Sequence, residues 1–178
     1  MEYQELDLRD LAAASGFELK PSVGGITGLD KIIADEMVLP WRMQKRFGYK
    51  GTAHSLMFHA TGDSIGLIED ALGQLAARYY YSAGDIGAYI QPVERARTFY
   101  CAFDLYSNPT DDNDMEKVNA FFNEASEMLI NLGAFFDRPY GPWAEMMYRR
   151  NGNYAEYLKK IKAQLDPNNI MNPGKLCF

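Results

Sequence analysis

The sequence predicts an α+β fold with an antiparallel sheet and helices in the order β-α-β-β-α-β, which is the ferredoxin-like arrangement. Two stretches repeat apolar residues at the three- and four-residue spacing of a helix with one buried face. Between them, two strand-like stretches are joined by a polar turn, and the second is rich in aromatic residues, as strands often are. The chain has 178 residues, of which 47% are hydrophobic, enough for one such domain with extensions.

The first half of this pattern begins with a strand at 52–60, which ends at Thr61-Gly62. A helix is predicted at 63–78, with an apolar face formed by Ile65, Ile68, Leu72 and Leu75. Residues 85–91 and 97–106 are predicted as two strands, because a polar turn from Pro92 to Ala96 separates them.

The second half begins with a loop at 108–112, after which Asn113 and Glu116 form a capping-box-like pair. They predict a helix at 114–132. Its buried stripe comprises Val118, Phe121, Phe122, Ala125, Leu129 and Leu132.

A short fourth strand is predicted at 134–137, since Gly133 suits the end of the preceding helix. A split sheet of this order exposes one face unless something covers it. Residues 142–165 are rich in large apolar side chains and predict C-terminal helices that cover this face.

The chain is expected to divide into an irregular N-terminal extension, residues 1–51, and a domain formed by residues 52–178. Within the extension, residues 6–15 and 28–38 have some helical pattern. Residues 41–47 mix cations with large apolar groups. They form either a surface face with extended cationic side chains or a docking segment for a partner chain.

Composition excludes several classes of function. A net charge of -6 and a pI of about 4.9 argue against general nucleic-acid binding, which needs a positive field. No apolar run approaches the roughly 18 residues of a membrane span, and the acidic N-terminus has no signal core, so a cytoplasmic site is expected. Two cysteines and two histidines without a ligand pattern predict no metal site.

The chain end is unusually specific, since residues 165–178 read LDPNNIMNPGKLCF. The proline after Asp166 ends the preceding helix, and two asparagines, a second proline and a glycine predict an ordered turn. This turn presents Lys175. Either the lysine has a fixed role, or the run is a docked tail that only completes a core.

The run DPNNIMNPGK is similar to the closing motif of the vanillyl-alcohol oxidase and p-cresol methylhydroxylase flavoproteins, and FAD-linked relatives such as D-lactate dehydrogenases end similarly. Residues 133–138, which read GAFFDR, resemble the family's Gly-aromatic-x-x-Tyr-Arg segment, and their distance from the closing motif fits. Residues 104–106 and 119–124 match the strand and the helix that precede this segment in the family. The resemblance covers residues 52–178 and implies the C-terminal cap domain of an FAD-linked oxidase.

The resemblance also implies site residues. Arg138 matches an active-site arginine, whose permanent charge would stabilise a phenolate or the anion of reduced flavin; an ion pair with Asp137 is the alternative. Asp137 replaces the family's tyrosine and would repel a phenolate, while Tyr140 is a nearby catalytic substitute. Lys175 matches a closing cation near the flavin ring, where it would raise the flavin potential. Asn172, in the same run, is the cofactor-binding candidate beside it.

Two further features depart from the family. Some members bond FAD covalently to a cap-domain histidine, for which His54 is the candidate here. Aligning Phe58 with the family's aromatic residue places Ser55 at that position, so a structural histidine is the alternative. The acid that cresol-oxidising members carry in the strand after the first helix would fall near Gly87 or Ala88, and neither is acidic.

The family's FAD-binding domain, with its glycine-rich pyrophosphate loop, is not recognisable here, because the glycines at 24–28 are too short and isolated a cluster. The chain is therefore expected to be either the smaller part of a split flavoprotein or a fragment of a longer one. In a split flavoprotein, a partner chain would bind most of the FAD. This chain would supply the cap for hydride transfer from a small substrate of 4-hydroxybenzylic or 2-hydroxy-acid type. The alternative is a non-catalytic cap-like module that binds a protein or small molecule and has lost flavin chemistry.

Overall fold

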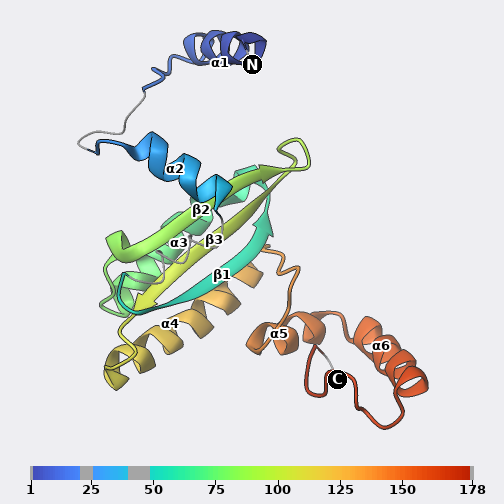
Figure 1. Ribbon diagram of the computed structural model, residues 1–178. Coiled ribbons are helices and arrows are strands. Elements are labelled where there is room, and N and C mark those ends of the chain that lie inside the picture. Colours follow the sequence, from blue (N-terminus) through green and yellow to red (C-terminus); the bar gives the residue numbers. More distant parts are fainter. Residues whose placement is uncertain (1, 21–25, 40–48, 177–178) are drawn as a thin grey trace. The chain divides into compact units, whose positions relative to one another are not determined.

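The computed structural model describes residues 2–20, 26–39 and 49–176. The chain forms two compact units, residues 1–46 and 47–178 (Figure 1). The described part of the first unit forms the helices α1 (Glu2–Ala14) and α2 (Leu29–Val38). The docking segment considered at 41–47 lies outside the described residues, as do most of the N-terminal glycines.

The second unit holds the predicted alternation of strands and helices. In chain order it contains β1 (Thr52–Ala60), α3 (Gly62–Arg78), the short 3-10 helix η2 (Ala83–Asp85), β2 (Ile86–Val93), β3 (Thr98–Ser107), α4 (Asp112–Asn131), α5 (Pro142–Arg150) and α6 (Gly152–Leu165). The mixed α+β class is therefore confirmed. Among the described helices, none combines the length and apolar character needed to cross a bilayer.

The sheet has the strand order β1-β3-β2, and both pairs are antiparallel. The predicted four-stranded sheet is wrong in its count, because the described residues form three strands. The segment at 134–137 contributes one bridge, in which Phe135 and His59 exchange two backbone hydrogen bonds of 2.8 Å. Pro139 follows almost at once and has no N–H to continue a ladder, so the ferredoxin-like fourth strand does not extend.

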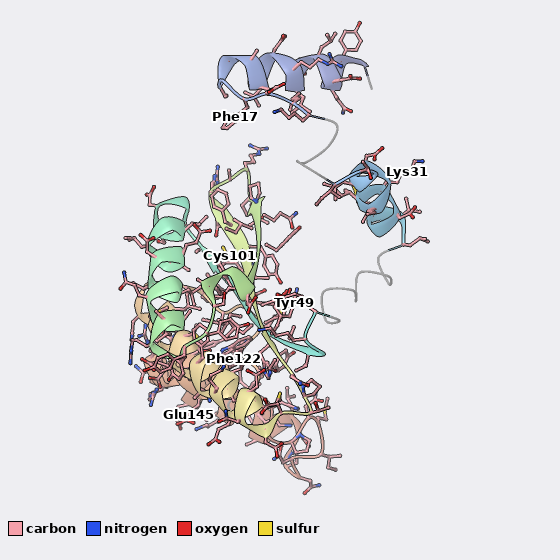
Figure 2. The ribbon with its side chains drawn as sticks, turned by 90° about the vertical axis from the view of Figure 1, so that its left-hand side faces the viewer. Phe17, Lys31, Tyr49, Cys101, Phe122 and Glu145 are labelled. Carbon is pink, nitrogen blue, oxygen red and sulfur yellow. The ribbon has the colours of Figure 1, made fainter. Side chains whose placement is uncertain are left out.

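The core lies on one face of this sheet. Alternate residues of β1 are buried there, among them Leu56 and Phe58, and their partners Phe103 and Cys101 in β3 face the same side. As predicted, α3 and α4 pack on that side and against each other (Figure 2). They add Ile68, Leu72, Leu75, Val118, Phe121 and Leu129 to the same cluster.

The start of α4 differs from the prediction, because Asp111 and not Asn113 is the cap. The Asp111 carboxylate accepts hydrogen bonds from the backbone N–H groups of Asn113 and Asp114, at 3.1 and 3.2 Å. Five residues suited to a helix N-cap follow one another at 110–114. A helix cap was therefore predicted correctly from the sequence, but the capping residue was not.

The predicted cover over the second face of the sheet is also wrong. α5 packs on α4 instead, and Trp143, 7% exposed, inserts its ring 4.7 Å from the ring of Phe136. Its indole N–H donates to the Ser126 hydroxyl at 2.8 Å. The Arg150 guanidinium also donates to the carbonyl of Ile130, which joins the ends of the two helices. Within the described part of the second unit, the other face of the sheet therefore carries no helix.

Candidate functional site

A buried carboxylate lies on this second sheet face. Strand pairing places Ser55 of β1, Asp104 of β3 and Gly87 of β2 in one row across it. The Ser55 hydroxyl donates a hydrogen bond to Asp104, which is 6% exposed. A carboxylate therefore does lie beside Gly87, although on the neighbouring strand. The signal that sequence reasoning passed over is a charged residue inside the apolar run of β3.

A second polar group lies at the end of β1. The bridge between His59 and Phe135 brings the segment after α4 alongside the strand. One oxygen of Asp137, Oδ2, then lies 3.7 Å from His59 Nε2 and 3.7 Å from Arg138 Nε. We call these three residues, His59, Asp137 and Arg138, the Asp137 corner. The Arg138–Asp137 ion pair considered from the sequence is present, and His59 lies beside the same carboxylate oxygen.

The Asp137 corner borders a hollow of about 370 Å³. Its lining comprises His59, Ala60, Thr61, Thr98, Gly133, Phe135 and Asp137. Arg138 is not part of this lining, and its side chain is 67% exposed. The corner therefore offers a carboxylate and an imidazole at a hollow, with a solvent-accessible guanidinium beside them.

The closing segment, residues 166–176, is organised by Asp166. Its carboxylate accepts hydrogen bonds from the Lys162 ammonium and from the backbone N–H groups of Ile170 and Met171, the latter two at 2.9 and 2.8 Å. These donors, led by Lys162, lower the pKa of Asp166 to about 2. Asn172 adopts a positive φ of 48°, which asparagine tolerates better than most residues.

A cavity of about 550 Å³ lies between α6 and this closing segment. Its apolar lining comes from Leu158, Ile161, Leu165, Met171 and Leu176. Polar groups are supplied by Tyr140, Asn172 and Lys175, together with the Lys162–Asp166 pair. Three of the five predicted site residues, the tyrosine, the asparagine and the closing lysine, therefore line one cavity.

The other two predicted residues lie elsewhere. Arg138 is outside the lining of that cavity, although its carbonyl accepts a 2.8 Å hydrogen bond from the N–H of Tyr140. His54 belongs to the helix-covered side of β1, where its Nε2 lies 3.0 Å from the Ser107 hydroxyl and its ring is near Phe122. Burial lowers its pKa below the ordinary value. This placement favours the structural histidine, and the flavin-binding role of His54 stays a prediction.

FAD is the cofactor that the sequence implies, and the 550 Å³ cavity has groups that suit its flavin ring. The ring is flat and gains negative charge at its oxygen and nitrogen edge when reduced. An apolar lining suits its faces, while Lys175, Asn172 and Tyr140 provide one cation and hydrogen-bond donors. The described residues bring no three histidine, cysteine or carboxylate side chains together as a metal site would.

Comparison with known proteins gives similarity to FAD-linked oxidases. Residues 141–176 match the family of FAD linked oxidases, C-terminal domain. A stretch of 70 residues is 36% identical to glycolate oxidase subunit GlcD of Bacillus subtilis (strain 168), covering 36% of this chain and 14% of that relative. No solved structure matches the chain. The resemblance to FAD-linked oxidases is thereby confirmed, and the chain spans a small part of the relative's length.

Proposed function

We propose that this chain, whose residues 141–176 match the C-terminal domain of FAD-linked oxidases, supplies the substrate-side cap of a split FAD-dependent oxidoreductase. A partner chain carries the FAD-binding domain and holds most of the cofactor. Bound flavin supplies the oxidant, which accepts a hydride from a substrate C–H bond. The residues of this chain position the substrate and stabilise charge on the reduced ring.

The convergence of Tyr140, Asn172 and Lys175 on one apolar cavity carries this proposal. All three come from the chain end or from just before α5, so they belong to or adjoin the matched segment. A lysine ammonium beside the reduced ring would offset its negative charge and raise its potential. The Lys162 and Asp166 side chains also line this cavity, and their opposite charges neutralise each other in an ion pair.

Between the two substrate types, the Asp137 corner favours a 2-hydroxy acid. A phenolate would meet the Asp137 carboxylate at the position where the family has a tyrosine, and like charges repel. The exposed guanidinium of Arg138 is suited to a substrate carboxylate, because its planar donors match two carboxylate oxygens. GlcD, the relative that matches part of this chain, is named as a glycolate oxidase subunit.

One observation is also compatible with the alternative, a cap-like module without flavin chemistry. The surface around the cavity is strongly apolar, with Tyr140, Leu165, Ile170 and Met171 all more than half exposed. Such a patch is typical of a protein-binding surface. A cap that docks on a flavin-binding partner also needs such a patch. Binding to a partner therefore does not distinguish the two functions, whereas flavin absorbance of the complex does.

The test is the absorption spectrum of the complex that purifies with an affinity-tagged chain. Flavin bands that bleach on anaerobic addition of glycolate or D-lactate, and not of 4-hydroxybenzyl alcohol, are the expected result. A colourless complex would support the non-catalytic module. Titration of FAD into the isolated chain is a further check, because micromolar or tighter binding without a partner would contradict the split arrangement.

A further inference from the structure

We propose that Lys162 is a positioning residue. It keeps the Asp166 carboxylate occupied, so that the ammonium of Lys175 stays available for a negatively charged group in the cavity of the closing segment. The inference rests on the proposed function, which it deepens by naming the residue that keeps the closing cation unpaired. Lys162 acts on the bound ligand through Asp166 and Lys175.

The charges that line the 550 Å³ cavity are those of Lys162, Asp166 and Lys175. With one carboxylate and two ammonium groups, either lysine could pair with Asp166. If Lys175 formed the pair, its charge would be neutralised, and an anionic ligand would compete with the carboxylate for it. The choice of partner therefore decides whether the closing lysine offers a positive charge to the ligand.

In the structure, the carboxylate pairs with Lys162. The two residues lie one helical turn apart at the C-terminal end of α6, where the helix dipole favours a cation. Their side chains are only 16% and 7% exposed, so water weakens their attraction less than that of a surface pair. The Lys162 ammonium also donates to the carbonyl of Met171. Two acceptors therefore hold this ammonium in place.

The other contacts of the Asp166 carboxylate come from the backbone. Its Oδ1 accepts from the N–H of Ile170, and its Oδ2 accepts from the N–H of Met171 as well as from Lys162. Lys162 is the main reason why the pKa of Asp166 falls to about 2. Without Lys162, a carboxylate bound only to neutral donors would line the same cavity as Lys175.

Lys175 reaches the cavity without a partner of this kind. The turn before it contains Asn172 and Gly174 at positive φ angles of 48° and 71°, and its backbone N–H donates to the Asn172 carbonyl at 3.3 Å. The residue is exposed, and within the part of the chain that the structure describes its ammonium forms no ion pair. The negative edge of a bound ligand is therefore suited to neutralise it.

The first test needs neither flavin nor a partner. In the isolated full chain, limiting acetic anhydride modifies neutral amines, and peptide mass spectrometry gives the acetylation rate of Lys175 relative to exposed Lys31. Lys162→Met removes the charge and keeps a long side chain. Lys175 should then pair with Asp166, which raises its pKa and slows its acetylation roughly threefold or more. Lys162→Gln, which keeps a donor for the Met171 carbonyl, should have the same effect.

A second substitution separates this role from simple fastening of the closing segment. Asp166→Asn added to Lys162→Met should restore the wild-type acetylation rate, because no carboxylate remains to pair with Lys175. Lys160→Met makes the same change at an exposed lysine of α6 outside the cavity lining, and it should leave the rate unchanged. If Lys162 only fastened the segment, its loss would make Lys175 more accessible. An unchanged or faster rate in Lys162→Met therefore overturns the proposal.

The second test measures the midpoint potential of the flavin in the assembled complex. Lys162→Met should lower this potential, as Lys175→Ala does. The two changes together should lower it little more than either alone, because both remove the same available cation. Asp166→Asn added to Lys162→Met should raise the potential again. Additive shifts would mean that Lys162 acts on the ring directly, and they would overturn the proposal.

The outcomes separate this inference from the proposed function. A complex without flavin would contradict the proposed function, while the acetylation rates of the isolated chain would still decide how Lys175 is paired. A flavin-containing complex in which Lys162→Met changes neither the acetylation of Lys175 nor the flavin potential would leave the proposed function standing and overturn the inference.

Discussion

Removing the Ser126 hydroxyl should weaken the attachment of α5 to the core. Ser126 is fully buried. Its hydroxyl accepts a hydrogen bond from the Trp143 indole N–H at 2.8 Å, and its O–H donates to the Phe122 carbonyl at 2.7 Å. Ser126→Ala leaves the indole N–H buried without its acceptor. An orphaned buried donor costs about 1–3 kcal/mol, so the free energy of unfolding should fall by that amount.

A double-mutant cycle isolates this effect. Trp143→Phe removes the donor. In the Trp143→Phe background, the loss in free energy of unfolding caused by Ser126→Ala should therefore be smaller than in the wild type, by at least about 1 kcal/mol. Urea unfolding followed by far-UV circular dichroism gives the four free energies, and an unchanged slope against urea shows that the same unfolding is measured. Ser82→Ala, at an exposed position, is the control and should change stability by no more than about 0.5 kcal/mol. Additive effects of Ser126→Ala and Trp143→Phe would refute the reasoning.

Three further predictions concern the site. The pKa of Asp166, lowered to about 2, means that its contribution to stability is present above its ordinary pKa and is lost as pH falls toward 2; Asp166→Asn should flatten this part of the stability profile, measured by urea unfolding at several pH values. Arg138→Ala should slow flavin reduction in the complex roughly tenfold or more, equivalent to about 1.4 kcal/mol of transition-state stabilisation, and an unchanged stopped-flow rate would remove it from the site. Lys175→Ala should lower the flavin potential or occupancy, measured by redox titration, whereas Lys159→Ala on exposed α6 surface should leave both unchanged.

The parts of the fold that depend on local pattern could be predicted from sequence. β1 begins and ends where expected, and α3 starts one residue earlier than expected and ends where expected, because apolar spacing and the Thr61-Gly62 stop act within a few residues. Whether 134–137 extends a sheet depends on pairing with a distant strand and on Pro139. The route of α5 depends on Trp143 finding a place beside α4. The local sequence pattern predicts neither the extent of the sheet at 134–137 nor the position of α5.

The candidate site divides in the same way. Tyr140, Asn172 and Lys175 lie within residues 140–175 and were predicted from a resemblance to known motifs. All three line one cavity. His59 was missed because only the bridge to Phe135, far along the chain, places it beside Asp137. A histidine near the end of a strand carries no sequence signal of its partner.

The single carboxylate of Asp166 has a consequence for motion at the chain end. It gathers an ammonium and two successive backbone N–H groups, and Lys162 also donates to the carbonyl of Met171. The three bonds to Asp166 share one acceptor side chain, so they should break in one local opening and not one by one. The amide protons of Ile170 and Met171 should therefore exchange with solvent at closely similar rates. Lys175, which lies in the same segment, would then leave and regain its position at the cavity together with the rest of the segment.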